Sequence, residues 1–179
     1  AFRFYTPPQQ MLDPSRGIEW ARWCVGGTTN VVLNCIDRHR DTPAWKRPFL
    51  VWEGEDRRAQ RSLSYRDFDA EVCRLAGALL ALGVGRGDSV GLYMPNLPET
   101  FVAFFAVMKI GAVVMPLFSG FGPQPLTSRL NDGEAKVVLT ADGTWRRGTP
   151  GAMKSVLDEA LESVPSVQHV LVLRHLGDA

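Results

Sequence analysis

The stretch from Gly83 to Phe118 constrains the fold more than any other part of the chain, because it reads as strand, helix and strand in succession. Two short apolar runs, 89–94 and 112–118, have the length expected of strands that are buried on both faces of a parallel sheet. The segment between them, 97–110, is long enough for a helix of about four turns at a rise of about 1.5 Å per residue. The stretch therefore predicts one βαβ unit.

Both ends of this helix carry sequence signals. Asn96 and Glu99 have the spacing of an N-cap and its capping-box partner. Pro98 falls in the first turn, where its missing N–H is harmless, and Gly111 supplies a C-terminal stop. We therefore expect Asn96 to cap the helix.

The helix is apolar on every face between Phe101 and Met108, where it reads FVAFFAVM. A helix of this kind must be covered on all sides. A chain of 179 residues with a single sheet can bury one side of it and has little left for the other. We therefore expect that covering elements are missing and that the chain is part of a larger protein.

The segments before this unit are predicted from periodicity and turn signals. They comprise an irregular lead-in over residues 1–27 anchored by Trp20 and Trp23, an amphipathic helix over 30–40, a hairpin of strands 49–54 and 61–65, and a helix that runs from the capping pair Ser64 and Asp67 to Gly83.

The segments after it continue the alternation of helix and strand. They are a helix from Pro123 to about Asp132, a strand over 136–141, a polar loop over 142–151, a helix over 152–163 and a strand over 168–173. Such alternation predicts an α/β fold, a doubly wound and mainly parallel sheet with flanking helices, preceded by a small hairpin. Because the chain stops directly after a buried type of strand, we expect a partial domain over residues 28–179.

The composition argues against several classes of partner. Lys and Arg number 20 against 19 Asp and Glu, and the net charge of +1 is too small to favour nucleic acid or an anionic membrane. No run approaches the roughly 18 apolar residues of a membrane-spanning helix, and the N-terminal residues lack an apolar signal segment. We expect a soluble, cytoplasmic protein.

Known catalytic and metal motifs are absent from the sequence. Cys24, Cys35 and Cys73 are widely spaced and predict reduced packing thiols without a disulfide or a zinc site. The glycines of GVGRGD at 83–88 follow a helix and precede a strand, the reverse of a dinucleotide-binding loop, so they predict a turn. We therefore expect no catalytic residue and no metal ligand in this chain.

Two loops follow predicted strands at their C-terminal ends, where open α/β sheets bind ligands. In the first, 119–123, Gly120 and Gly122 fit either a plain turn or the close approach of a narrow ligand. In the second, 142–148, Arg146 and Arg147 are either solvated or able to clamp a phosphate. The residues alone leave both alternatives open.

Several motifs in one order resemble a known family. They are TTNVVLNCIDRH, LVWEGE, LSYRDF, GVGRGDSVGLYMPNLPE, KIGAVVMPLFSGFGP and KVVLTADG. Over residues 18–176 the chain resembles the N-terminal part of acetyl-CoA synthetase and its short-chain acyl-CoA synthetase relatives, in the AMP-forming adenylating superfamily. The glycine-rich phosphate loop and the later motifs of that family are absent.

The resemblance implies a ligase that joins a short-chain carboxylate to ATP with Mg, releases pyrophosphate, and passes the acyl group to coenzyme A. It also implies that residues 28–179 are the first α/β subdomain, truncated before the phosphate loop. We therefore expect an N-terminal fragment that is inactive alone and binds none of these cofactors alone.

The resemblance also carries over individual contacts to coenzyme A. Gly120 matches a glycine that lines the pantetheine tunnel, and Arg146 matches an arginine near the nucleotide end of coenzyme A. Where some relatives have a further arginine, this chain has Thr149, with Arg147 as the substitute.

An alternative of a different class is a self-contained, non-catalytic module. It would dock on a partner, or associate with itself, through the apolar surface around Phe101, Phe104 and Phe105.

Overall fold

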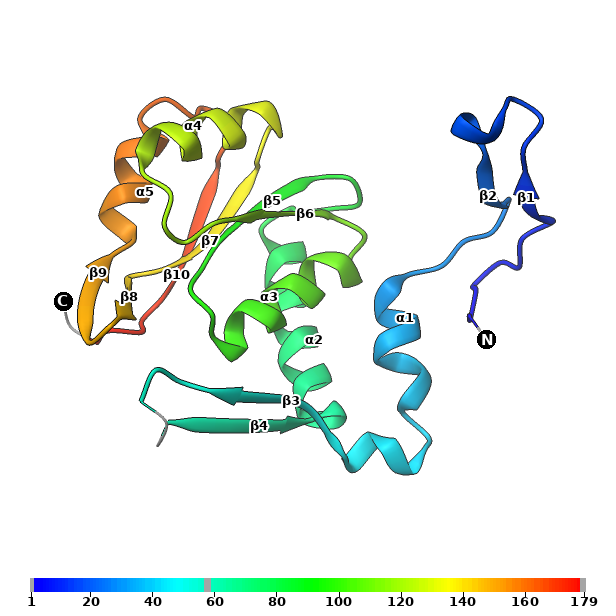
Figure 1. Ribbon diagram of the computed structural model, residues 1–179, viewed down its shortest axis with the longest axis horizontal. Helices are drawn as coiled ribbons and strands as arrows, with labels where there is room; N and C mark the ends of the chain where they lie inside the picture. Colours follow the sequence, from blue (N-terminus) through cyan, green and yellow to red (C-terminus); the bar gives the residue numbers. More distant parts are fainter. Residues whose placement is uncertain (1, 57–58, 178–179) are drawn as a thin grey trace.

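The computed structural model describes residues 2–56 and 59–177, and a parallel four-stranded sheet lies at its centre (Figure 1). The strands stand in the order β10, β7, β5, β6, and every neighbouring pair is parallel. Their bounds lie within one residue of the predicted ones: β5 Ser89–Tyr93, β6 Val113–Leu117, β7 Val137–Ala141 and β10 His169–Leu173. The predicted βαβ unit is confirmed.

Helices cover both faces of this sheet (Figure 1). The two faces correspond to two apolar clusters, because alternate residues of a strand point to opposite sides. Val90 of β5 packs in the cluster with α2 and α3, whereas Tyr93 packs in the cluster with α4 and α5. The helices are α1 Val31–Cys35, α2 Tyr65–Ala81, α3 Pro98–Lys109, α4 Pro123–Asp132 and α5 Lys154–Leu161. The chain is doubly wound, as predicted.

Three antiparallel hairpins and three 3-10 turns complete the described part of the chain. The predicted hairpin is confirmed as β3 Pro48–Glu53 with β4 Gln60–Ser64. The other elements are β1 Gln10–Asp13, β2 Arg22–Val25, β8 Gly143–Arg146, β9 Thr149–Ala152, and 3-10 turns at Ile18–Trp20, Asp37–His39 and Pro43–Lys46.

Two of these hairpins correct the sequence analysis. The lead-in predicted over residues 1–27 is not irregular over its described part, residues 2–27, since β1 pairs with β2 there. Trp20 and Trp23 do not anchor it, being 66% and 70% exposed. The predicted polar loop at 142–151 is the β8–β9 hairpin. Its turn has positive φ at both Arg147 (53°) and Gly148 (74°), the backbone that a tight hairpin turn requires.

The predicted N-cap of α3 is wrong. Leu97 occupies the N-cap position without a side-chain hydrogen bond, and Glu99 pairs with Arg61 of β4 instead of the helix start. The backbone carbonyl of Asn96 accepts a hydrogen bond from Trp52 Nε1 at 2.8 Å. Pro98 lies in the first turn, where its ring restricts φ to a value that suits a helix.

The starts of the two earlier helices follow the sequence more closely. Ser64 caps α2 and accepts a hydrogen bond from the Asp67 N–H at 3.2 Å, as predicted. The Asn30 side chain caps α1 by accepting from the Val32 N–H at 2.8 Å. The helix predicted over 30–40 is shorter, since α1 ends at Cys35 and the chain continues as a 3-10 turn.

The apolar helix α3 is covered by its own chain. Phe104 and Phe105 are partly buried against the core, and the Phe105 ring lies 5.5 Å from that of Phe68 and 5.7 Å from that of Phe49. Phe101 is 39% exposed. Helices α1 and α2 and the β3–β4 hairpin supply most of the second covering layer that a single sheet lacked, so this helix does not by itself require missing neighbours.

Three further expectations concern single features. Cys24 and Cys35 are partly buried and Cys73 is exposed, and all three are free. Within residues 2–56 and 59–177, no helix has the length and apolar character to cross a membrane, and no group of three metal-ligating side chains forms.

Candidate functional site

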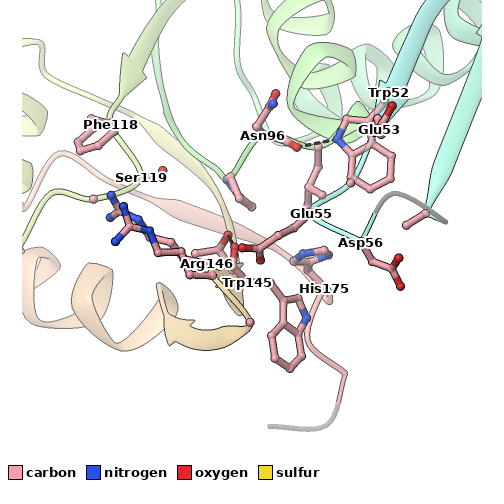
Figure 2. A pocket seen from close by; sticks show the side chains of 18 residues that line it. Trp52, Glu53, Glu55, Asp56, Asn96, Phe118, Ser119, Trp145, Arg146 and His175 are labelled. Carbon is pink, nitrogen blue, oxygen red and sulfur yellow. Dashed lines mark hydrogen bonds between the residues drawn. The ribbon is translucent and has the colours of Figure 1, made fainter.

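A cavity of about 910 Å³ opens at the C-terminal edge of the sheet (Figure 2). Figure 2 places Phe118 and Ser119 on one side, Trp52 and Asn96 on the opposite side, and Arg146, Trp145 and His175 between them. The wall is assembled from five separate segments: the tip of the β3–β4 hairpin, the loop after β5, the loop after β6, the β8–β9 hairpin and the residues after β10.

Tyr93 of β5 holds the loop after β6 in place through its hydroxyl group. Its hydroxyl donates to the Ser119 carbonyl at 3.3 Å and to the Phe121 carbonyl at 3.1 Å, and burial raises the pKa of Tyr93 above its ordinary value. Gly120 leaves room for the Phe118 ring, because a Cβ at this position would lie 2.6 Å from that ring and the ring would have to move. The loop therefore presents bare backbone to the cavity beside an exposed aromatic ring.

The β8–β9 hairpin gives the cavity its positive charge. Arg146 and Arg147 are both exposed and line the cavity, and neither forms a salt bridge within the described part of the chain. Trp145 lines the same wall and is 48% exposed. Two free guanidinium groups beside an indole can bind phosphate groups and stack on a planar ring.

The opposite wall is acidic. Glu53, Glu55 and Asp56, at the tip of the β3–β4 hairpin, line the cavity. The hydrogen bond from Trp52 to the Asn96 carbonyl ties this hairpin to the sheet edge.

Asp142 fixes the base of the arginine-bearing hairpin. Its carboxylate accepts hydrogen bonds from the backbone N–H of Gly143 at 2.8 Å, of His175 at 2.8 Å and of Leu176 at 3.1 Å. Its backbone carbonyl accepts from Met153 at 3.1 Å, at the start of α5. One residue thus joins the end of β7, the base of β8 and the segment after β10.

The Asp142 clamp predicts a dependence on pH. Burial alone would raise the pKa of the carboxyl, but the N–H groups of His175, Leu176 and Gly143 favour the charged form, and the net pKa lies below its ordinary value. A lowered carboxyl pKa stabilises the fold above the ordinary aspartate pKa, and this contribution is lost as the pH falls through the lowered value. In an NMR titration, the His175 and Leu176 amide signals should move at a pH below 3.8. Asp142→Asn should remove the transition, and an amide signal titrating at an ordinary pKa would contradict the clamp.

The structure brings all three predicted site residues to this one cavity, since Gly120, Arg146 and Arg147 all line it. Thr149 stands directly opposite Arg146 in the β8–β9 ladder. Sequence reasoning did not find Trp52, His175 or Asp142. The position of Asp142 directly after a buried strand was the one available signal.

Residues 36–179 match the family described as AMP-binding enzyme. The chain belongs to the AMP-binding enzyme family. The chain is also 43% identical to the acetyl-coenzyme A synthetase of Mycobacterium tuberculosis strain H37Rv. The match covers 96% of this chain and 27% of the M. tuberculosis protein. The chain is 43% identical to the acetyl-coenzyme A synthetase of Streptomyces coelicolor, over 92% of the chain and 26% of that protein.

A solved structure of the same kind matches the fold. Acetoacetyl-CoA synthetase from Streptomyces lividans superposes with a TM-score of 0.88 at 27% identity, over 99% of this AMP-binding chain and 27% of that one. The chain therefore spans about a quarter of the length of the relatives that it matches.

Proposed function

We propose that this chain is the N-terminal part of an AMP-forming acyl-CoA synthetase that acts on acetate or another short-chain acid. The parent reaction converts a carboxylate and ATP, with Mg, into an acyl-adenylate and pyrophosphate, and then transfers the acyl group to the thiol of coenzyme A with release of AMP. The supporting observation is the cavity, which unites Gly120, Arg146 and Arg147 from separate loops.

The lining of the cavity supports coenzyme A as the ligand, because it offers exposed guanidinium groups and a glycine backbone. Coenzyme A supplies the thiol that accepts the acyl group. Arg146 and Arg147 would hold phosphate groups, because exposed guanidinium groups without an acidic partner are available for charge-assisted hydrogen bonds. Gly120 would let the narrow pantetheine arm lie against the backbone, since glycine carries no side chain there.

The position of this cavity indicates which substrate this part of the parent enzyme would bind. The residues proposed here bind and orient the acyl acceptor, whereas ATP and Mg would be bound by segments outside this chain. We propose that residues 28–179 form the first α/β subdomain, located in the cytoplasm and inactive alone. ATP–pyrophosphate exchange by the isolated chain should be zero, and robust exchange would overturn this assignment.

Replacing both arginines tests the coenzyme A contact. In the full-length enzyme, the double variant Arg146→Ala with Arg147→Ala should raise the KM for coenzyme A by roughly 10- to 100-fold, because two charge-assisted phosphate contacts are lost. Carboxylate-dependent ATP–pyrophosphate exchange should stay unchanged, since adenylation precedes the entry of coenzyme A. Steady-state kinetics and isotope exchange measure the two quantities.

A matched control is Arg86→Ala. Arg86 is also exposed but lies at the turn before β5, at the opposite edge of the sheet. This variant should leave both quantities unchanged. An unaltered KM for coenzyme A in the double variant would reject the proposed contact.

The docking-module alternative keeps only Phe101 as an exposed member of its surface, so we do not favour it.

A further inference from the structure

Residues 2–28, the N-terminal arm, carry a concentration of exposed apolar side chains. The six largest of them are 59–77% exposed: Phe2, Tyr5, Met11, Ile18, Trp20 and Trp23. In Figure 1 the arm projects away from the layered α/β part and reaches it through the segment that leads into α1. So many large, exposed apolar side chains within one short segment are typical of a surface that another protein surface covers.

The arm is secured only at its base. Within the described residues, β1 and β2 form ladders with each other alone, and an isolated bridge joins Thr6 to Thr28. Hydrogen bonds link the Arg3 backbone to Asn34, at 2.8 Å from the Arg3 N–H and 2.9 Å to the Arg3 carbonyl. These bonds fix where the arm leaves the fold, but they cover none of its apolar side chains.

A two-stranded hairpin without a packing surface is marginally stable in water. The arm nevertheless belongs to the part of the fold that relatives share. The solved Streptomyces lividans synthetase matches 99% of this chain with a TM-score of 0.88, so nearly the whole arm has a counterpart there. That protein contains far more chain, because the match spans only 27% of it. The residues of that longer protein outside the match offer a surface on which such an arm can pack.

We propose that the N-terminal arm docks within the same polypeptide, on the portion of the synthetase that lies outside these 179 residues. The inference rests on the proposed function in one respect, that the parent is a full-length synthetase. The receiving surface is apolar and offers hydrogen-bond acceptors, because the indole N–H groups of Trp20 and Trp23 have no protein partner in the described part of the chain. Docking makes the arm a clasp between the N-terminal subdomain and the rest of the enzyme.

Hydroxyl-radical footprinting of the full-length wild-type enzyme tests the clasp. The oxidation rate of each residue is compared with its own rate in the urea-unfolded enzyme, and Phe68, which is 0% exposed, gives the level of full protection. Trp20 and Trp23 should approach the protection of Phe68, and dilution of the enzyme to the monomer should not change it. Rates equal to those of the unfolded enzyme would overturn the proposal, and protection lost on dilution would replace it with docking on a second copy.

Substitution gives an independent measurement. In the full-length enzyme, Trp23→Ser should lower the Tm by a few degrees, and Trp23→Phe should restore most of the loss because the ring is retained. An unchanged Tm in Trp23→Ser would contradict docking. An exposed arm combined with the expected coenzyme A kinetics would reject the clasp alone, whereas a protected arm with unaltered kinetics in the arginine variant would reject the coenzyme A contact alone.

Discussion

Asp69→Ala should lower the free energy of unfolding by about 3 kcal/mol, the lower end of what breaking a buried ion pair costs. Asp69 lies on α2 and is 6% exposed. Its carboxylate accepts from Arg40 Nη2 at 2.8 Å and from Lys109 Nζ, on α3, at 3.2 Å. The variant would leave two cations facing a partly buried space. Urea denaturation followed by circular dichroism measures the loss.

We expect the loss of unfolding free energy to lie at the lower end of this range, because both cations keep Asp37 as a second partner. Asp37 Oδ1 lies 3.0 Å from Lys109 Nζ and 3.1 Å from Arg40 Nη2. Burial favours the neutral amine of Lys109, but hydrogen bonds to Asp37 and Asp69 outweigh this effect and raise its pKa. Lys109 is therefore charged at neutral pH. The stability of the cluster depends on the carboxylates of Asp37 and Asp69, which balance this charge.

An exposed ion pair on the same helix is the matched control. Arg66 and Asp67 form a salt bridge at 3.1 Å with side chains 65% and 48% exposed. Water screens such a pair, so Arg66→Ala should shift the denaturation midpoint by only a small fraction of the shift in Asp69→Ala. Equal shifts in the two variants would show that burial does not set the strength of the Asp69 cluster.

The sequence predicted the layered part of the fold well because its signals are local. Each strand of the sheet is a short apolar run between turns, and Gly83 and Gly111 mark helix ends where the chain adopts positive φ, 78° and 76°. Gly91 shows the limit of local reading. A Cβ there would lie 2.9 Å from Leu130 on α4, so its role is defined by a neighbour distant in the sequence.

The missed elements depend on contacts that the sequence does not encode locally. The β8–β9 hairpin turns at Arg147 with positive φ, a conformation that arginine does not signal. The cover of α3 comes from α1, α2 and β3, which approach it only after the chain has folded. The α3 start was misread for the same reason, since Glu99 is paired with Arg61 from another element.

The candidate site was partly predictable. The rule that ligands bind at the C-terminal edge of a parallel sheet located both loops, and the family resemblance selected Gly120 and Arg146 within them. Trp52 could not be predicted to join them, because the β3–β4 hairpin is placed over the sheet edge by contacts distant in the sequence, such as the hydrogen bond from Trp52 to the Asn96 carbonyl 44 residues away.

Gly143→Ala should disrupt the arginine-bearing hairpin at its base. A Cβ at this position would lie 2.5 Å from the Gly151 carbonyl oxygen and 2.4 Å from Leu176 Cδ1, and the backbone oxygen belongs to the paired strand β9. Overpacking of this kind costs about 1–3 kcal/mol. Because Arg146 lies at the far end of the same strand, the hairpin should lose both stability and its orientation toward the cavity.

The matched control for this variant is Gly151→Ala. A Cβ at Gly151 meets its nearest atom at 3.8 Å, an ordinary contact, and Gly151 stands in the opposite strand of the same hairpin. In the full-length enzyme, Gly143→Ala should therefore raise the KM for coenzyme A while Gly151→Ala leaves it unchanged, with carboxylate-dependent pyrophosphate exchange retained in both. If the two alanines behaved alike, the base of β8 would not control the position of Arg146, and the link from Asp142 through this hairpin to the cavity would be lost.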